Sequence, residues 1–155
     1  MAATIAQRLA ELGIELPSPA APAANYVPAR LSGNLLVISG QLPMEGGSLR
    51  YKGKLGGGVS LEDGQAAARL CAINILAQTK AALGGDLSRI RRVVKLNGFI
   101  ASTTTFIEQH LVMNGASNLI AKVLGDAGIH ARAAVGMAAL PFNAAVEIDA
   151  VIEIA

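Results

Sequence analysis

Residues 130–149 read His-Ala-Arg-Ala-Ala-Val-Gly-Met-Ala-Ala-Leu-Pro-Phe-Asn-Ala-Ala-Val-Glu-Ile-Asp, and this stretch carries more information than any other in the chain. A single arginine, Arg132, stands in an apolar run that ends at Leu140-Pro141. From residue 145 to 154 the apolar residues alternate with acids, so the two kinds of side chain point to opposite faces of a strand. We therefore predict strands near 132–139 and 145–154.

Arg132 is the first candidate for a functional residue. An isolated guanidinium among Ala, Val, Gly and Met is costly to desolvate unless an anion meets it. Its planar fork can hold a carboxylate through two parallel hydrogen bonds. The alternative is an ordinary structural ion pair or an arginine that reaches out to solvent.

Two blocks of the chain resemble the RidA/YjgF family of enamine/imine deaminases, whose members often carry the label "endoribonuclease L-PSP". The family signature is an arginine followed eight residues later by Leu-Pro and then by a Val/Ile-Glu-Ile-Glu/Asp strand, which Arg132, Leu140-Pro141 and residues 146–149 match. The second block is Tyr26-Val27 followed by Gly-Asn-Leu-Leu-Val-Ile-Ser-Gly-Gln-Leu-Pro at 33–43. The likeness covers roughly residues 24 to 155.

The resemblance implies a substrate-binding role for Arg132, as a clamp on the carboxylate of a 2-imino or 2-enamino acid. It implies that Glu147 is the catalytic acid, which positions or activates water or manages a proton. The alternative for Glu147 is a solvated row of acids, because Asp149 and Glu153 share its strand face.

Five more residues are carried over as substrate-binding positions. Tyr26 and Ser39-Gly40 are expected to line the pocket, although Ser39-Gly40-Gln41 also fits a strand end with a bulge. Asn114 falls near a family asparagine on the second helix. Ala134 stands where typical deaminases carry a cysteine, a position at which the family chiefly uses backbone groups.

Composition limits the classes of function. A net charge of +2, with one basic cluster at residues 89–92, argues against a nucleic-acid partner. The 52% hydrophobic and 15% charged content suggests burial between subunits. Arg8 and Glu11 interrupt any signal-peptide core, and the single Cys71 fits a buried thiol in a reducing compartment. We expect a cytoplasmic protein without a membrane span.

The expected organisation is a helix and a Pro/Ala connector at 1–23, followed by a RidA/YjgF-like domain at 24–155. Strands are predicted at 26–30, 34–39 and 90–100, with a short one near 49–52. Helices are predicted at 4–12, capped by Thr4, and at 61–83, with a sheet-facing stripe that includes Ala66, Leu70 and Ile73. These elements predict an α+β fold of two layers, a mixed sheet with two helices on one face. The resemblance implies the chorismate-mutase-like version of that fold and a homotrimer with sites in the subunit clefts.

Two local predictions concern the site. Thr105-Phe-Ile-Glu108 has the pattern of a capping box that opens the second helix, and Asn114-Gly115 should break that helix. If Arg132 and Glu147 lie on a hairpin that turns near Phe142, an offset of about five residues, roughly 16 Å, separates them.

The leading functional hypothesis is hydrolysis of reactive enamines or imines, such as 2-aminoacrylate, to 2-keto acids and ammonia. The resemblance implies no organic cofactor, and His110 and His130 with the single Cys71 do not form a zinc set, so no metal is expected. One alternative is a non-catalytic, regulatory binder of small carboxylates or keto acids. A ribonuclease is a third reading, which the weak basic patch disfavours.

Overall fold

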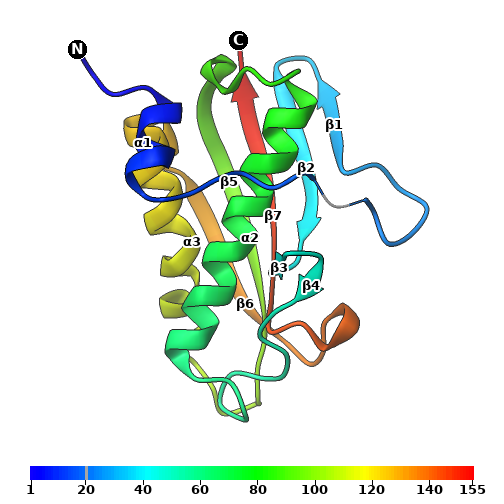
Figure 1. Cartoon of the computed structure of the whole chain (residues 1–155). Helices are drawn as coiled ribbons and strands as arrows, with labels where there is room; N and C mark the ends of the chain where they lie inside the picture. Colours follow the sequence, from blue (N-terminus) through cyan, green and yellow to red (C-terminus); the bar gives the residue numbers. More distant parts are fainter. Residues whose placement is uncertain (20) are drawn as a thin grey trace.

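The computed structural model describes residues 1–19 and 21–155 (Figure 1). Ala20, which belongs to the predicted connector, lies outside the described residues. The order of the elements is α1 (Ile5–Glu11), β1 (Ala29–Ser32), β2 (Leu35–Gln41), β3 (Met44–Glu45), β4 (Ser48–Leu49), α2 (Leu61–Ala82), β5 (Ile90–Ala101), α3 (Gln109–Leu124), β6 (Ala131–Met137) and β7 (Val146–Ile154). Short 3-10 turns lie at Leu87–Arg89, Gly125–Gly128 and Pro141–Asn143.

Five strands form one mixed sheet in the order β1-β2-β7-β5-β6. Only β5 and β6 run parallel, and β2, β7 and β5 pair antiparallel. Strands β3 and β4 form a separate small hairpin. The predicted α+β class with a mixed sheet is confirmed, and β1 and β6 are the two edges of the main sheet.

Helices α2 and α3 cover the same face of the sheet (Figure 1). The alternation in β7 buries Val146, Ile148, Ala150, Ile152 and Ile154 under the helices and leaves its acids on the other face. Cys71 on α2 is completely buried, as predicted. The predicted stripe on α2 was partly wrong, because Ala67, Ala68, Cys71, Ala72 and Ile75 are buried, whereas Ala66, Leu70 and Ile73 are only half-buried.

The predicted start of α3 was wrong. The helix begins at Gln109, and the Gln109 amide donates to the Phe106 carbonyl at 2.7 Å and to Ser102 Oγ at 3.3 Å. The predicted break at Asn114-Gly115 was also wrong, because α3 runs through both residues. A side chain at position 115 would collide with the backbone of Gln65, so this glycine lets α2 and α3 approach closely.

The predicted hairpin between β6 and β7 was wrong as well. Strand β5 lies between them, with Leu96 paired to Arg132 on one side and to Ala150 on the other. Glu147 pairs with Phe99, three residues further along β5. Arg132 and Glu147 are therefore two strand spacings apart, about 10 Å across the sheet, and about 10 Å apart along it.

The N-terminal segment begins as predicted. Thr4 caps α1 in a reciprocal capping box with Gln7, and Arg8 donates to the carbonyl of Val123 on α3 at 3.3 Å. Residues 12–19 then cross the outer side of α2, in the direction of β1 (Figure 1). The first strand begins at Ala29, so Tyr26 lies in a loop and not in the strand predicted at 26–30. None of the helices in the described part of the chain has the length and apolar content to cross a bilayer.

Candidate functional site

The structure divides the predicted site residues into two groups at different places on the sheet. Arg132, Asn114 and Ala134 lie together where β6 meets α3. The second group lies around the end of β2 and the start of β7, and it consists of Tyr26, Ser39, Gly40 and Glu147. The two groups also face opposite sides of the sheet, because Arg132 pairs with the buried, helix-facing Leu96, whereas Glu147 lies on the uncovered face.

Helix α3 holds the Arg132 guanidinium by three hydrogen bonds. NH1 donates to Asn114 Oδ1 and to Ser117 Oγ, both at 3.0 Å, and NH2 donates to the His110 carbonyl at 2.9 Å. A guanidinium has five N–H donors. Among residues 1–19 and 21–155, nothing accepts a hydrogen bond from Nε. Nε and the second NH2 hydrogen form one edge of the fork, and that edge has the geometry for a bidentate carboxylate.

Ser117 and His130 extend this network. His130 Nδ1 lies 2.6 Å from the Gly128 carbonyl, and Nε2 lies 2.9 Å from Ser117 Oγ. A carbonyl only accepts, so Nδ1 carries a proton, and when the ring carries only this proton, Nε2 accepts from the Ser117 hydroxyl. The lone pairs of Ser117 are then available to Arg132. Neither residue was predicted to belong to the site, and the only signal in the sequence is the position of His130 two residues before Arg132.

Ala134 lies on the same face of β6 as Arg132. It pairs with Gly98 of β5 and packs partly against the core. A side chain at Gly98 would collide with Met113 of α3, so α3 lies close over this part of the sheet. The close approach of α3 to β5 at Gly98 therefore limits the size of the space beside Ala134.

Glu147 lies directly over Gly40. A Cβ at position 40 would collide with the Glu147 carboxylate and would lie 2.9 Å from its Cδ, so only glycine leaves room for this side chain. Partial burial, with a smaller contribution from the nearby Asp149 charge, raises the pKa of Glu147 above its usual value. Asp149 accepts a hydrogen bond from Asn97 at 2.7 Å. A carboxyl group with a raised pKa is suited to exchange protons near neutral pH.

Ser39 fixes the loop that carries Tyr26. Its Oγ donates to the Val27 carbonyl at 2.8 Å, and its backbone N–H donates to the Pro28 carbonyl at 2.9 Å. A register shift between Ile38 and Gln41 confirms the bulge that the sequence suggested here. Tyr26, next to the Val27 and Pro28 carbonyls that Ser39 holds, is 47% exposed.

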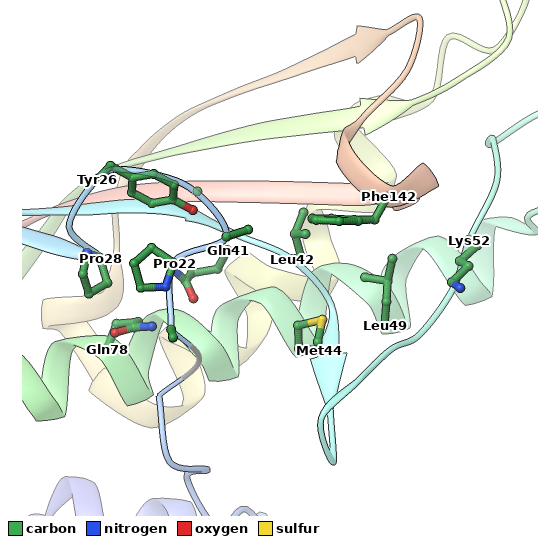
Figure 2. Close-up of a pocket in the computed structure, with 13 residues that line it drawn as sticks. Pro22, Tyr26, Pro28, Gln41, Leu42, Met44, Leu49, Lys52, Gln78 and Phe142 are labelled. Carbon is green, nitrogen blue, oxygen red and sulfur yellow. The ribbon is translucent and has the colours of Figure 1, made fainter.

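A cavity of about 370 Å³ opens beside Tyr26 and Gly40 (Figure 2). Its walls come from the connector, the end of β2, the β3–β4 hairpin, α2 and the turn before β7. Its lining residues are Ala21, Pro22, Ala23, Tyr26, Pro28, Gly40, Gln41, Leu42, Met44, Leu49, Lys52, Gln78 and Phe142. Sequence reasoning missed all of these except Tyr26 and Gly40, because five separate segments contribute to the walls.

The described residues contain no group of three or more His, Cys, Asp or Glu side chains placed to hold a metal ion.

Comparison with known proteins places this geometry in a family. The family model described as "YjgF/chorismate_mutase-like, putative endoribonuclease" matches residues 6–154. Protein TCP17 of Trypanosoma cruzi is 52% identical over 151 residues, which cover 97% of this chain and 94% of TCP17. The crystal structure of Atu1372 from Agrobacterium tumefaciens is 65% identical with a TM-score of 0.92, covering 97% of this chain and 92% of that one.

A third relative carries the name of the family that the two sequence blocks resemble. The crystal structure of RidA from the Antarctic bacterium Psychrobacter sp. PAMC 21119 is 32% identical, with a TM-score of 0.62, covering 88% of this chain and 94% of that one. The fold, the two sequence blocks and these matches agree. The chain belongs to the YjgF/chorismate mutase-like (RidA/YjgF) family.

Proposed function

We propose that the protein hydrolyses 2-imino acids, and the enamines that tautomerise to them, to 2-keto acids and ammonia. The observation that carries the proposal is the pairing of two chemically complementary half-sites. Arg132 offers a pre-positioned fork for a carboxylate, and Glu147 is a carboxyl group whose pKa is raised by burial.

We further propose a homotrimer in which the Arg132 half-site of one subunit meets the Glu147 half-site of the next. Within one chain the two half-sites face opposite sides of the sheet, so one small ligand cannot touch both. Strand β6 is an edge strand, and the uncovered face of the sheet exposes Leu35, Val37 and Val135 by 39–45%. Apolar side chains on an open sheet face favour burial against a second copy.

In this arrangement Arg132 binds the substrate carboxylate and fixes the position of C2. Glu147 accepts a proton from a water molecule as that water adds to C2, and it returns the proton to the nitrogen, which gives a tetrahedral carbinolamine. Glu147 then moves the proton of the new C2 hydroxyl group to the nitrogen, so that ammonia leaves as the carbonyl forms. The balanced reaction is one imino acid and one water giving one keto acid and one ammonia. Tyr26 and the Gly40 backbone flank the water and the substrate, and Asn114 and Ser117 hold Arg132 in position.

The test has two parts. Light scattering should give about three times the 15.8 kDa chain mass at micromolar concentration, and a stable monomer would contradict the shared site. Imines produced in situ by an amino-acid oxidase should decay faster with the protein present, with ammonia released in equal amount.

A non-catalytic keto-acid binder is the second candidate, because Ala134 replaces the cysteine of typical deaminases. Calorimetric binding of pyruvate that depends on Arg132, with no acceleration of any imine, would favour this candidate. The ribonuclease reading predicts tight RNA binding at physiological salt. With a net charge of +2, we expect weak binding that salt abolishes.

A further inference from the structure

We propose that Ser117 and His130 are positioning residues, through which the binding of a carboxylate at Arg132 is coupled to the uptake of one proton by the His130 ring. A carboxylate therefore binds more tightly as the pH falls through the range in which imidazole groups titrate, roughly pH 5–8. This inference rests on the proposed role of Arg132 and adds a dependence on pH that the proposed reaction does not require.

Ser117 connects the two cationic side chains. Its Oγ lies 3.0 Å from Arg132 NH1 and 2.9 Å from His130 Nε2. The two nitrogens are therefore no more than about 6 Å apart, a range over which one charge acts on the protonation of another group. All three side chains line one surface pocket of about 310 Å³ between α3 and β6. A proton on the His130 ring thus changes the surroundings of Arg132 through a shared hydroxyl group.

The charge of His130 decides the direction of its hydrogen bond to Ser117. Nδ1 lies 2.6 Å from the Gly128 carbonyl, which only accepts, so Nδ1 keeps its proton in both states of the ring. In the neutral ring Nε2 accepts from the Ser117 hydroxyl. In the imidazolium Nε2 donates instead, and the Ser117 oxygen accepts from His130 and from Arg132 together. A proton from solvent can therefore bind to Nε2 without the loss of either contact.

Protonation places two positive charges around one hydroxyl oxygen. Both groups are partly buried, and within the part of the chain that the structure describes no carboxylate forms an ion pair with either of them. A substrate carboxylate on the free edge of the Arg132 fork adds a negative charge to this cluster and favours the imidazolium. The imidazolium favours the bound carboxylate by the same amount, because coupling between two binding sites is reciprocal.

Other charged side chains on the neighbouring elements do not supply this coupling. Lys122 on α3 and Asp126 in the turn before β6 are exposed, and neither lines the pocket. Lys95 on β5 belongs to the uncovered face of the sheet, opposite to Arg132. Among the described residues that line the pocket, His130 and Arg132 alone have titratable side chains. The pH dependence of the Arg132 region is therefore assigned to His130.

The test is calorimetric binding of pyruvate, which stays ionised throughout, between about pH 5.5 and pH 8.5. Glu147→Gln is the parent protein, because Glu147, whose pKa is raised by partial burial, also loses its negative charge as the pH falls. The dissociation constant should fall by about threefold or more toward pH 5.5, the scale of two unit charges roughly 8 Å apart near a protein surface. Near pH 7 the binding enthalpy should vary with the ionisation enthalpy of the buffer, in the sense of net proton uptake.

The chain contains two histidines, and the second provides a matched control. His130→Gln should bind pyruvate as the parent does at pH 8.5 and should lose the gain at pH 5.5. His110→Gln should keep the full gain, because the His110 side chain is exposed and its contact with Arg132 uses the backbone carbonyl. Ser117→Ala removes the shared hydroxyl group and should reduce the gain.

A measurement without any change at His130 guards against misfolding of its variant. Nitrogen chemical shifts of the His130 ring in the parent protein should show that saturating pyruvate raises the pH at which Nε2 takes up its proton. Pyruvate binding that depends on Arg132 but not on pH, or a gain that persists in His130→Gln, would overturn the coupling and leave the proposed function intact. An unchanged gain in Ser117→Ala would remove Ser117 from the coupling. Absence of pyruvate binding at every pH, with no imine hydrolysis by wild type, would overturn both proposals.

Discussion

The two half-sites differ in how the protein treats their charged groups. The Arg132 guanidinium donates hydrogen bonds to three acceptors on α3, and one of these, Ser117, is hydrogen-bonded in turn to His130. Around Glu147, a carboxyl group is partly buried beside a glycine and an apolar cavity. The first region fixes the position of the positively charged guanidinium, and the second destabilises the negatively charged form of the Glu147 carboxyl group. This difference supports the proposed roles of binding for the Arg132 region and proton transfer for the Glu147 region.

The largest expected effect concerns proton transfer. Glu147→Gln keeps the shape of the side chain over Gly40 and removes its basic oxygen. We expect imine hydrolysis to slow by about 10²-fold or more, the usual scale for general acid–base catalysis. Keto-acid affinity, measured by calorimetry, should stay within about twofold of wild type. Equal acceleration by wild type and variant would remove Glu147 from the reaction.

Changes at Arg132 should affect binding and turnover together. Arg132→Ala should weaken keto-acid binding and lower kcat/KM by roughly tenfold to a hundredfold, because charge-assisted hydrogen bonds contribute about 1.5–3 kcal/mol each. Arg132→Lys should recover only part of this loss, since an ammonium cannot reproduce the planar fork. A full recovery by lysine would show that charge alone matters there.

Ser117 and His130 provide a finer test of the Arg132 region. Ser117→Ala removes one acceptor of NH1 and should raise the dissociation constant of pyruvate by about fivefold, within the range of a single hydrogen bond. If His130 acts through Ser117, His130→Phe should weaken binding in wild type and add nothing in the Ser117→Ala background. Nitrogen chemical shifts should show the proton of His130 on Nδ1. If the two substitutions weaken pyruvate binding additively, or if the proton lies on Nε2, His130 does not act on Arg132 through Ser117.

The smallest effect concerns stability near Glu147. Its folded-state pKa is raised, so the stabilising contribution is complete below the unfolded value of about 4.3 and is lost as pH rises through the folded-state pKa. Glu147→Gln should therefore melt above wild type at pH 7 and no higher than wild type at pH 4. Glu15→Gln, at an exposed position, is the matched control. A variant that melts below wild type at pH 7 would show that the carboxylate is stabilised in the fold.

Local patterns in the chain determined much of the fold. Alternation along 145–154 and the Thr4 cap of α1 each depend on neighbours within a few residues, and the structure contains both. The two motif blocks pointed to the family, because short motifs with a fixed spacing can be read directly from the sequence. Arg132 and Glu147 could be singled out for the same reason.

Tertiary structure decided how those residues are related. The start of α3 at Gln109 and its continuity through Gly115 depend on contacts with Ser102 and with the backbone of Gln65, which lie outside the helix. The insertion of β5 between β6 and β7 follows from strand pairing across long stretches of chain, which alternation cannot encode. That insertion places Arg132 and Glu147 two strand spacings apart, and the three-residue offset between their partners Leu96 and Phe99 puts them on opposite faces of the sheet. The cavity beside Gly40 exists only because five separate segments meet there.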